Sequence, residues 1–283
     1  MKTQHVIWGI IGIVALAAAA YGLWDNWTFV TTDNAAVNAH SVLLAPKVAG
    51  IIQKVLVDEG QTVKAGQLLV QIDPRDYENS LNTYKGLMQS FEAQRINAER
   101  DLRRQKDLLE KNVATQQQFD LSVAALGDVA GRIEAAKAQV AQAALNIENT
   151  QLKAPADGFI VRRSAEVGQM ASAGVPLIGF VDGTERWVVA NLKETELKGV
   201  LVGNEAEITV DAIGGKVFHG TVESISAATG STFTLLPPDN ASGNFTKVVQ
   251  RVPVKIKLQK LEPKDMEALR DGLSVITKVK KTH

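Results

Sequence analysis

The residue types that most often carry catalysis or metal binding are few in this sequence and widely spaced. The chain has no cysteine, and its four histidines are His5, His40, His219 and His283. Their spacing matches neither His-x-His nor His-Glu-x-x-His, and the chain has no nucleophile elbow and no phosphate-binding Gly-x-x-x-x-Gly-Lys run. The paired carboxylates Asp58 and Glu59 precede a turn glycine, where solvation accounts for them. We therefore expect no enzyme activity, no metal and no cofactor.

Composition narrows the class of protein further. The chain has 283 residues, 31 Lys and Arg against 31 Asp and Glu, and 45% apolar residues. The apolar fraction is ample for folded cores, and a neutral balance argues against a broad basic face for nucleic acid. The absence of cysteine excludes disulfide scaffolds, thiolate nucleophiles and a lipidated N-terminal cysteine.

The N-terminus carries the signal of a membrane anchor. Val6 to Trp24 contains no charged residue, and 19 helical residues span about 28 Å, close to the thickness of a bilayer core. Lys2 precedes this run, whereas no Lys or Arg occurs from Asp25 to Pro46. The positive-inside rule then predicts a single-pass protein with its N-terminus in the cytoplasm. A signal peptide cleaved near Ala18–Ala20 is the alternative.

An internal repeat is the most informative feature of the rest of the chain. Residues 44–73 and 153–182 each begin near an Ala-Pro pair and share glycines at spacings of ten and six residues. The glycines of the two copies are Gly50, Gly60 and Gly66, then Gly158, Gly168 and Gly174. Each copy has short β-branched runs broken by turn signals and is too small to bury a core alone. We expect the two copies to pair into one β-sandwich.

The segment between the two copies is typical of a helical hairpin. Residues 75–154 lack proline, and residues 75–111 and 116–152 predict two arms of equal length, each about 55 Å long. Thr115 and Gln118 have the spacing of a capping box that starts the second arm. The predicted seam of the first arm is Leu81, Tyr84, Met88, Phe91, Arg95, Ala98, Leu102, Gln105 and Leu109. The predicted seam of the second arm is Phe119, Val123, Leu126, Ala130, Ile133, Lys137, Val140, Ala144 and Ile147.

The C-terminal third reads as short strands with turns between them, which predicts a small antiparallel barrel. The expected strands are 187–191, 206–210, 217–225, 251–258 and 274–279, joined by the N-terminal strand Phe29 to Val37. Lys193 to Gly199 is expected to be a short helix. The long loop 227–245 is either a transporter contact or gate, or an ordinary surface loop.

The two glycine-spaced halves resemble a biotin-carrier or lipoyl domain split at its central hairpin. The corresponding stretch here, Ile72 to Tyr77, has no lysine to modify and opens into the helical arms. A split lipoyl domain, a coiled-coil hairpin, a following β-domain and an anchor together resemble the periplasmic adaptors, or membrane fusion proteins, of the HlyD/EmrA family. Gly230–Asn244 and Val248–Val254 make the sequence most similar to the EmrA type of multidrug efflux adaptor.

The resemblance implies a mainly β fold with a long helical hairpin. Its divisions are an anchor at 1–27, a strand for the barrel at 28–42, lipoyl halves at 43–73 and 153–182, the hairpin at 74–152, and the barrel with the membrane-proximal region at 183–283. It also implies that several copies assemble in the cell inner membrane. They would link a major-facilitator multidrug exporter to a TolC-like outer-membrane channel. Adaptors for aromatic acid efflux or ATP-driven protein secretion, and a biotin or lipoyl carrier subunit, are the alternatives.

Family members that dock to a TolC-like channel carry Arg, Leu and Ser or Thr at fixed spacing near the hairpin tip. Arg104, Leu108 and Thr115 fit that spacing here. An Arg donor and an exposed Leu beside a turn can bind the ends of partner helices. The alternative is that Arg104 is solvated, Leu108 is part of the coiled-coil core, and Thr115 is only the helix cap.

Overall fold

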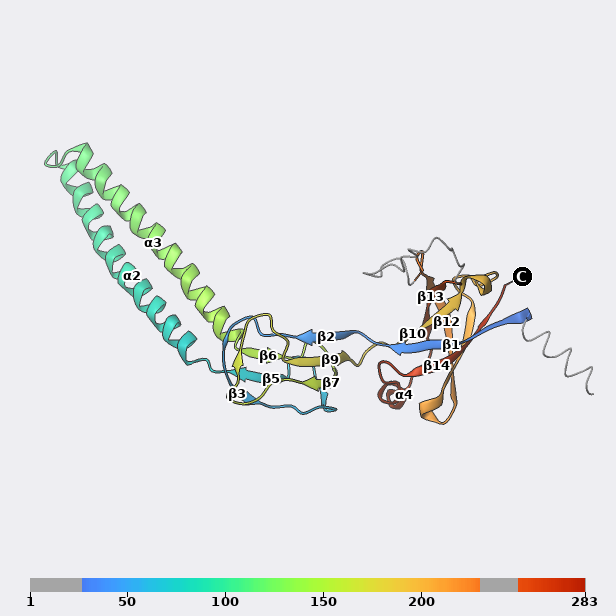
Figure 1. The fold of residues 1–283 in the computed structure, drawn as a ribbon. Helices are drawn as coiled ribbons and strands as arrows, with labels where there is room; N and C mark the ends of the chain where they lie inside the picture. Colours follow the sequence, from blue (N-terminus) through green and yellow to red (C-terminus); the bar gives the residue numbers. More distant parts are fainter. Residues whose placement is uncertain (1–26, 230–248, 283) are drawn as a thin grey trace, which may run out of the picture. The chain divides into compact units, whose positions relative to one another are not determined.

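The computed structural model describes residues 27–229 and 249–282 (Figure 1). They form two compact units, one made of the chain up to Ser41 with the chain from Val181, the other of Val42–Phe180. The predicted span Val6–Trp24, the segment Gly230–Asn244 and most of the predicted loop 227–245 lie outside the described residues. Within the described ranges, every helix is too short or too polar to cross a bilayer.

The sandwich interleaves the two halves of the repeat, as the sequence predicts. Its eight strands are β2 (Ser41–Leu44), β3 (Gly50–Val55), β4 (Thr62–Val63), β5 (Leu68–Ile72), β6 (Gln151–Lys153), β7 (Gly158–Arg163), β8 (Met170–Ala171) and β9 (Ile178–Asp182). They form two sheets, in the orders β2-β9-β7-β4 and β6-β5-β3-β8. Each sheet takes two strands from each half, and the core between them includes Ile52, Leu69, Ile160 and Phe180.

Hydrogen bonds between the halves repeat with an offset of 108 residues. The amide of Gly60 donates to the carbonyl of Ile160 at 2.7 Å, and the amide of Gly168 donates to the carbonyl of Ile52 at 2.9 Å. Both glycines have positive φ, 81° and 86°, which a side chain would disfavour. The two copies therefore have the same backbone geometry and are related by an approximate twofold relationship.

The other four glycines of the repeat occupy matching places. Gly66 and Gly174 are turn residues whose amides donate to the carbonyls of Ala154 and Pro46, at 2.8 and 2.9 Å. Gly50 begins β3, where an added Cβ would lie 2.7 Å from Cγ2 of Ile72. Gly158 begins β7 and pairs with Val63 of β4.

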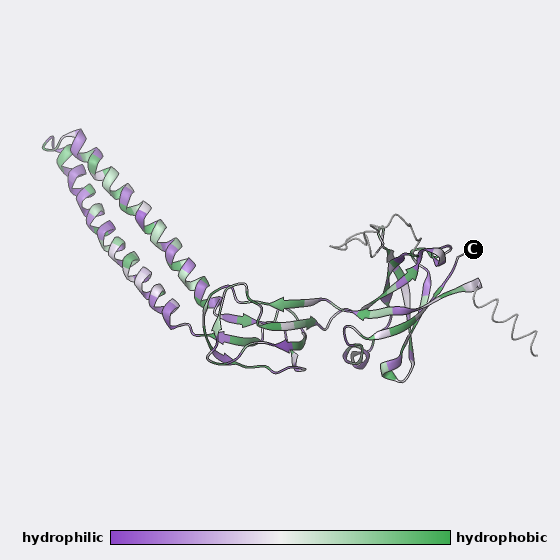
Figure 2. Ribbon diagram, in the orientation of Figure 1, coloured by the Kyte–Doolittle hydropathy of each residue, from purple (hydrophilic) through white to green (hydrophobic). Residues whose placement is uncertain are grey.

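The hairpin consists of α2 (Arg75–Glu110) and α3 (Gln116–Glu148), which lie side by side (Figure 1). Figure 2 shows that α2 is coloured mainly hydrophilic, whereas α3 carries more hydrophobic colour. The prediction of two 37-residue arms is wrong for the second arm, which ends at Glu148. The chain turns there because Gln151–Lys153 pairs with β5 and the amide of Ile72 donates to the carbonyl of Thr150 at 2.8 Å.

The seam of α3 also differs from the predicted one. The half-buried or buried positions are Phe119, Ser122, Leu126, Val129, Ile133, Ala136, Val140, Ala143, Asn146 and Ile147. The predicted Val123, Ala130, Lys137 and Ala144 are exposed, each one residue past a seam position. Small residues let the two helices approach closely, and the Ser122 hydroxyl donates to the carbonyl of Phe119 at 2.7 Å, so it is satisfied when buried. In α2, Tyr84 and Arg95 are exposed and the other predicted positions are half-buried.

The second unit is a closed antiparallel barrel, which confirms the predicted fold class. Its strands are β1 (Phe29–Asn38), β10 (Trp187–Lys193), β11 (Glu205–Val210), β12 (Lys216–Ile225), β13 (Arg251–Leu258) and β14 (Ser274–Lys280), in the order β1-β10-β13-β12-β11-β14. Strand β1 pairs with both β10 and β14 and so closes the barrel. The core is lined by fully buried aliphatic residues such as Val37, Leu192, Ile208 and Ile256. One short helix, α4 (Pro263–Ala268), precedes β14.

The predicted helix from Lys193 to Gly199 is wrong. Strand β10 extends through Lys193, and a single 3-10 turn, η1 (Glu194–Glu196), follows it. A second 3-10 turn, η2 (Asp211–Ile213), lies between β11 and β12. The start of the predicted helix is instead held by the sheet, since Lys193 pairs with Arg251 of β13 and the amide of Glu194 donates to the carbonyl of Gln250 at 2.9 Å.

Candidate functional site

The turn between α2 and α3 is held by backbone hydrogen bonds and by the predicted capping box. The carbonyl of Leu108 accepts from the amides of Val113 and Ala114, at 2.9 and 3.2 Å. The hydroxyl of Thr115 accepts from the amide of Gln118 at 3.3 Å, and the Gln118 side chain accepts from the amide of Thr115 at 2.9 Å. The tip is therefore a fixed structure that can present side chains without further ordering.

The structure places Arg104, Leu108 and Thr115 at this end of the hairpin. Arg104 is exposed and pairs with Asp101 one turn earlier on α2. Leu108 is half-buried, and the Thr115 hydroxyl is engaged as the helix cap. Docking to a channel through these residues stays a prediction, because each also has a role within the hairpin.

Sequence reasoning missed Val113, which is 72% exposed at the tip. It lies between Asn112, which has a positive φ of 56°, and the cap at Thr115. Loops usually carry polar residues, so a valine held outward by a rigid turn adds apolar surface where a partner could bind. The signal available in the sequence was a single branched apolar residue within Lys111–Ala114.

The lysine position of a true carrier domain is occupied here by a structural ion pair. Nη2 of Arg75 lies 2.6 Å from Oδ2 of Asp73, where the chain leaves β5 and enters α2. Hydrogen bonds from the Arg75 side chain and amide lower the pKa of Asp73. This junction has no side chain that biotin or lipoate could modify.

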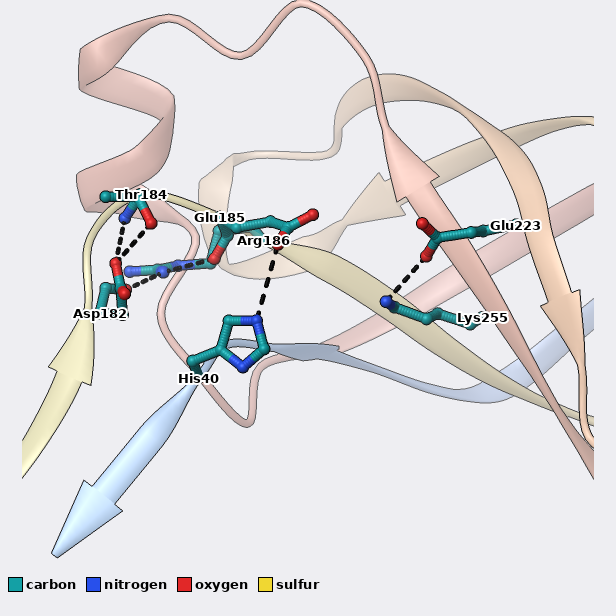
Figure 3. Close-up of polar contacts among 7 residues, drawn as sticks. All are labelled: His40, Asp182, Thr184, Glu185, Arg186, Glu223 and Lys255. Atoms are coloured by element: carbon teal, nitrogen blue, oxygen red, sulfur yellow. Dashed lines mark hydrogen bonds and ion pairs between the residues drawn. The ribbon is translucent and has the colours of Figure 1, made fainter.

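A second polar site lies in the barrel unit, around Arg186 (Figure 3). Arg186 is only 3% exposed, and its guanidinium donates to three backbone carbonyls. Nε donates to Leu269 at 2.9 Å, and Nη1 donates to Asp182 at 2.5 Å and to Glu185 at 2.9 Å. Burial lowers the pKa of Arg186, while the nearby Asp271 and Asp182 oppose that change. The arginine fixes the segment between β9 and β10 against the residue that follows α4.

Asp182 and His40 flank this arginine site. Burial acts to raise the pKa of Asp182, but hydrogen bonds from the amide and hydroxyl of Thr184, at 2.7 and 2.6 Å, and the charges of His40 and Arg186 outweigh it. The pKa of Asp182 is therefore lowered. The Nε2 atom of His40 lies 3.6 Å from Oε2 of Glu185, and its ring is 4.8 Å from that of Trp187.

The outer face of the barrel continues this polar arrangement. Nζ of Lys255 lies 2.8 Å from Oε2 of Glu223 and 4.9 Å from the ring of Trp187 (Figure 3). The hydrogen bond from Lys255 lowers the pKa of Glu223. These contacts join β10, β12 and β13 and act as structural interactions between neighbouring strands.

The candidate catalytic residues do not converge. His40 lies between β1 and β2 and His219 lies exposed on β12, whereas His5 and His283 lie outside the described residues. Asp58 is exposed, and the Glu59 carboxylate accepts from the amide of Arg163 at 2.8 Å, a structural role. Among residues 27–229 and 249–282, no three acidic or histidine side chains are grouped as metal ligands.

Comparison with known families agrees with this architecture. The family model described as "RND MFP, barrel-sandwich hybrid domain" matches residues 40–181, half of the chain. The chain belongs to the membrane fusion protein family. A second model, "AAEA-like beta-barrel domain", matches residues 186–278, which hold β10 to β13 and most of β14 of this membrane fusion protein, whereas β1 lies outside the match.

Named relatives and solved structures extend the match along the chain. The fatty acid resistance protein FarA of Neisseria gonorrhoeae is 33% identical, over 88% of this chain and 75% of its own length. The multidrug export protein EmrA of Haemophilus influenzae is 30% identical, over 95% of this chain and 80% of its own. The solved adaptor EmrA (TM-score 0.52, 22% identity) and the membrane fusion protein Spr0693 of Streptococcus pneumoniae R6 (0.66, 17%) share the fold. Each of these two alignments covers 90% of this chain and 99% of the chain in the solved structure.

Proposed function

We propose that this membrane fusion protein is the periplasmic adaptor subunit of a tripartite efflux system. It links an inner-membrane multidrug exporter of the major-facilitator type to a TolC-like outer-membrane channel. The observation that carries the proposal is similarity to EmrA and FarA along nearly the whole chain, through sandwich, hairpin and barrel together. A match confined to one domain would support only the fold.

The role is mechanical, not catalytic. Two charged side chains at structural junctions, Arg186 in the barrel unit and Asp73 at the end of the sandwich, are engaged in structural contacts. Energy coupling then resides in the exporter, and this chain connects the exporter in the inner membrane to the channel in the outer membrane. Several copies pack side by side, which the apolar and small residues exposed along α3 support.

Val6–Trp24 anchors the chain in the inner membrane, with Lys2 on the cytoplasmic side and the two folded units in the periplasm. The hairpin tip, with Arg104, Leu108 and Val113, meets the channel. An exposed Arg and rigid apolar side chains are typical of the residues that dominate protein interfaces.

The test measures accumulation of a fluorescent drug in cells that lack the chromosomal copy. Wild type is expected to restore export. Arg104→Ala and Leu108→Asp are expected to fail, and Arg103→Ala, next to Arg104 on α2, serves as the matched control. Because the Arg104 ion pair with Asp101 is exposed, its loss costs at most about 1 kcal/mol of stability. Export by both tip variants would count against docking through this tip, whereas unchanged drug accumulation on deletion would overturn the assignment of a drug as the cargo.

Apolar acids are a second candidate cargo, favoured by the similarity to a protein named for fatty acid resistance. The same strains are therefore tested for survival in long-chain fatty acids. Sensitivity to fatty acids without a change in drug accumulation would assign that cargo instead.

A further inference from the structure

A tight turn in the barrel unit holds two aliphatic side chains in solvent. Leu201 is 56% exposed and Val202 is 66% exposed. The amide of Asn204 donates to the carbonyl of Leu201 at 3.2 Å, and the Asn204 side-chain oxygen accepts from the amide of Leu201 at 2.8 Å. Gly203, with φ of 93°, donates its amide to the carbonyl of Val222 at 2.8 Å. The turn is thus rigid, and its apolar residues cannot turn inward.

Three turns of the same design in the sandwich show what is unusual here. In each, a glycine is followed by a glutamine whose side chain accepts from the amide three residues earlier. The two residues before the glycine are Asp58-Glu59, Lys64-Ala65 and Glu166-Val167. Each of these pairs begins with a charged residue, as expected for a solvated turn. The pair Leu201-Val202 has no charge, so exposing its two aliphatic side chains to water is unfavourable.

The position of this turn in the barrel indicates what covers its two aliphatic side chains in place of water. The amide of Thr282 donates to the carbonyl of Gly199, and the amide of Lys281 donates to the carbonyl of Thr28, both at 2.8 Å. We call Thr28, Lys198–Asn204 and Lys280–Thr282 together the anchor rim. It lies at the barrel end where β1 begins and β14 ends, and Figure 1 shows the start of β1 beside the C-terminus. The opposite end carries the β11–β12 hairpin, including Val217.

Chain length ties the anchor rim to the apolar segment at the N-terminus. Only four peptide links separate Trp24 from Thr28, and they span at most about 14 Å whatever their conformation. The headgroup layer on each side of a bilayer core is about 5–8 Å thick. If Val6–Trp24 lies in the bilayer, the rim is held within reach of the headgroups.

The charges beside the turn suit the same surroundings. Lys198 is exposed, and Lys280 pairs with Glu205 at 3.1 Å, with Lys281 next along the chain. Trp27, 62% exposed, begins the described chain on this rim. Aliphatic side chains beside lysines and a tryptophan are typical of segments that lie in a membrane interface.

We propose that the anchor rim rests on the lipid surface, with Leu201 and Val202 inserted among the headgroups and Lys198 at the level of the phosphates. The contact orients the barrel relative to the bilayer. This inference rests on the proposed function only in requiring that residues 6–24 anchor the chain.

The absence of cysteine makes the test direct. Full-length Val202→Cys is labelled with an environment-sensitive fluorophore and reconstituted into vesicles of phosphatidylethanolamine and phosphatidylglycerol that carry nitroxides at the headgroup. Val217→Cys, 47% exposed at the other end of the barrel, is the matched control. We expect quenching severalfold stronger at position 202 than at 217, with a blue-shifted emission at 202 only. Leu201→Cys is expected to behave like Val202→Cys.

The outcomes separate the lipid contact from the anchor. Equal, weak quenching at 202 and 217 in protein that sediments with the vesicles overturns the lipid contact and leaves the anchor intact. Failure to sediment with vesicles contradicts the anchor and removes the basis of the contact as well. If a photo-crosslinker at 202 captures an inner-membrane protein in cells and lipid quenching is absent, the turn binds the exporter and the inference is wrong.

Discussion

The Nε–H of Arg186 donates to the carbonyl of Leu269 at 2.9 Å, joining the residue before β10 to the residue after α4. These two residues are 83 positions apart in sequence. Nη1 of the same guanidinium donates to the carbonyls of Asp182 and Glu185, so two of the three guanidinium nitrogens have backbone acceptors. One side chain thereby fixes the start of the barrel's second strand against its C-terminal segment.

Arg186→Met is expected to lower the free energy of unfolding by about 2–4 kcal/mol, because three carbonyls lose their donor. Arg186→Lys should lie between wild type and Met, since an ammonium cannot reproduce the planar fork. Thermal unfolding followed by circular dichroism measures both. Arg270→Met, at an exposed site next to Leu269, is the control and should change stability by less than about 0.5 kcal/mol. Equal effects at 186 and 270 would contradict the assigned role.

The pKa of Asp182 predicts how stability depends on pH. Because its pKa is lower in the folded than in the unfolded state, the ionised carboxylate stabilises the fold above the unfolded value of about 3.9. That stabilisation is lost as the pH falls through the unfolded pKa toward the folded one. The stability gap between wild type and Asp182→Asn should therefore be full at pH near 7 and shrink below about pH 4. Urea unfolding at several pH values measures it, and a gap that does not change with pH would refute the prediction.

The α3 seam can be tested with adjacent alanines. Ala136 is 1% exposed against α2, whereas Ala135 is exposed. Ala136→Glu should destabilise the hairpin by about 2–4 kcal/mol, because it places a carboxylate in a close helix contact. Ala135→Glu should change stability by less than about 0.5 kcal/mol. Far-ultraviolet circular dichroism during heating reports both, and similar melting of the two variants would show that the seam lies elsewhere.

Thr115 can be separated into its capping role and any role in docking. Thr115→Ala should lose about 1 kcal/mol of hairpin stability, whereas Thr115→Ser and Thr115→Asp keep an acceptor for the amide of Gln118. If capping is all that Thr115 does, Ser and Asp both sustain drug export. If Thr115 also contacts the channel, Asp fails in export despite a stable hairpin. Melting temperature and drug accumulation are measured on the same set of variants.

The sequence was sufficient for the sandwich because its geometry is encoded in backbone-restricted positions. The positive φ at Gly60 and Gly168 favours glycine, so the same glycine spacing 108 residues apart identifies two turns of the same conformation. The capping box at Thr115 could also be predicted, since its hydrogen bonds join residues that are close in sequence. Features that depend on local backbone chemistry could therefore be predicted.

Features that depend on packing between elements could not be predicted from the sequence. A hydrophobicity pattern ranks Val123 above Ser122, yet the serine is buried and the valine exposed, because close approach to α2 favours the smaller residue. The end of α3 at Glu148 is likewise set by pairing of β6 with β5, a contact absent from the local sequence. At the tip, the outward orientation of Val113 follows from the turn around Asn112 and was not visible in composition.

The interleaved sheets also dictate an order of folding. Gly60 and Ile160 are 100 residues apart, and closing so long a loop in an open chain carries a large entropic cost before any contact repays it. Pairing of α2 with α3 is antiparallel and local near the tip, so it can propagate from the turn and bring Ile72 to Thr150. We infer that the hairpin forms before the sandwich closes. A chain that has been synthesised only as far as Glu110 contains the first half of the sandwich, whose strands still lack their partners from the second half. Those strand edges stay open to pairing with other chains until α3 has formed and brought the second half back to the first.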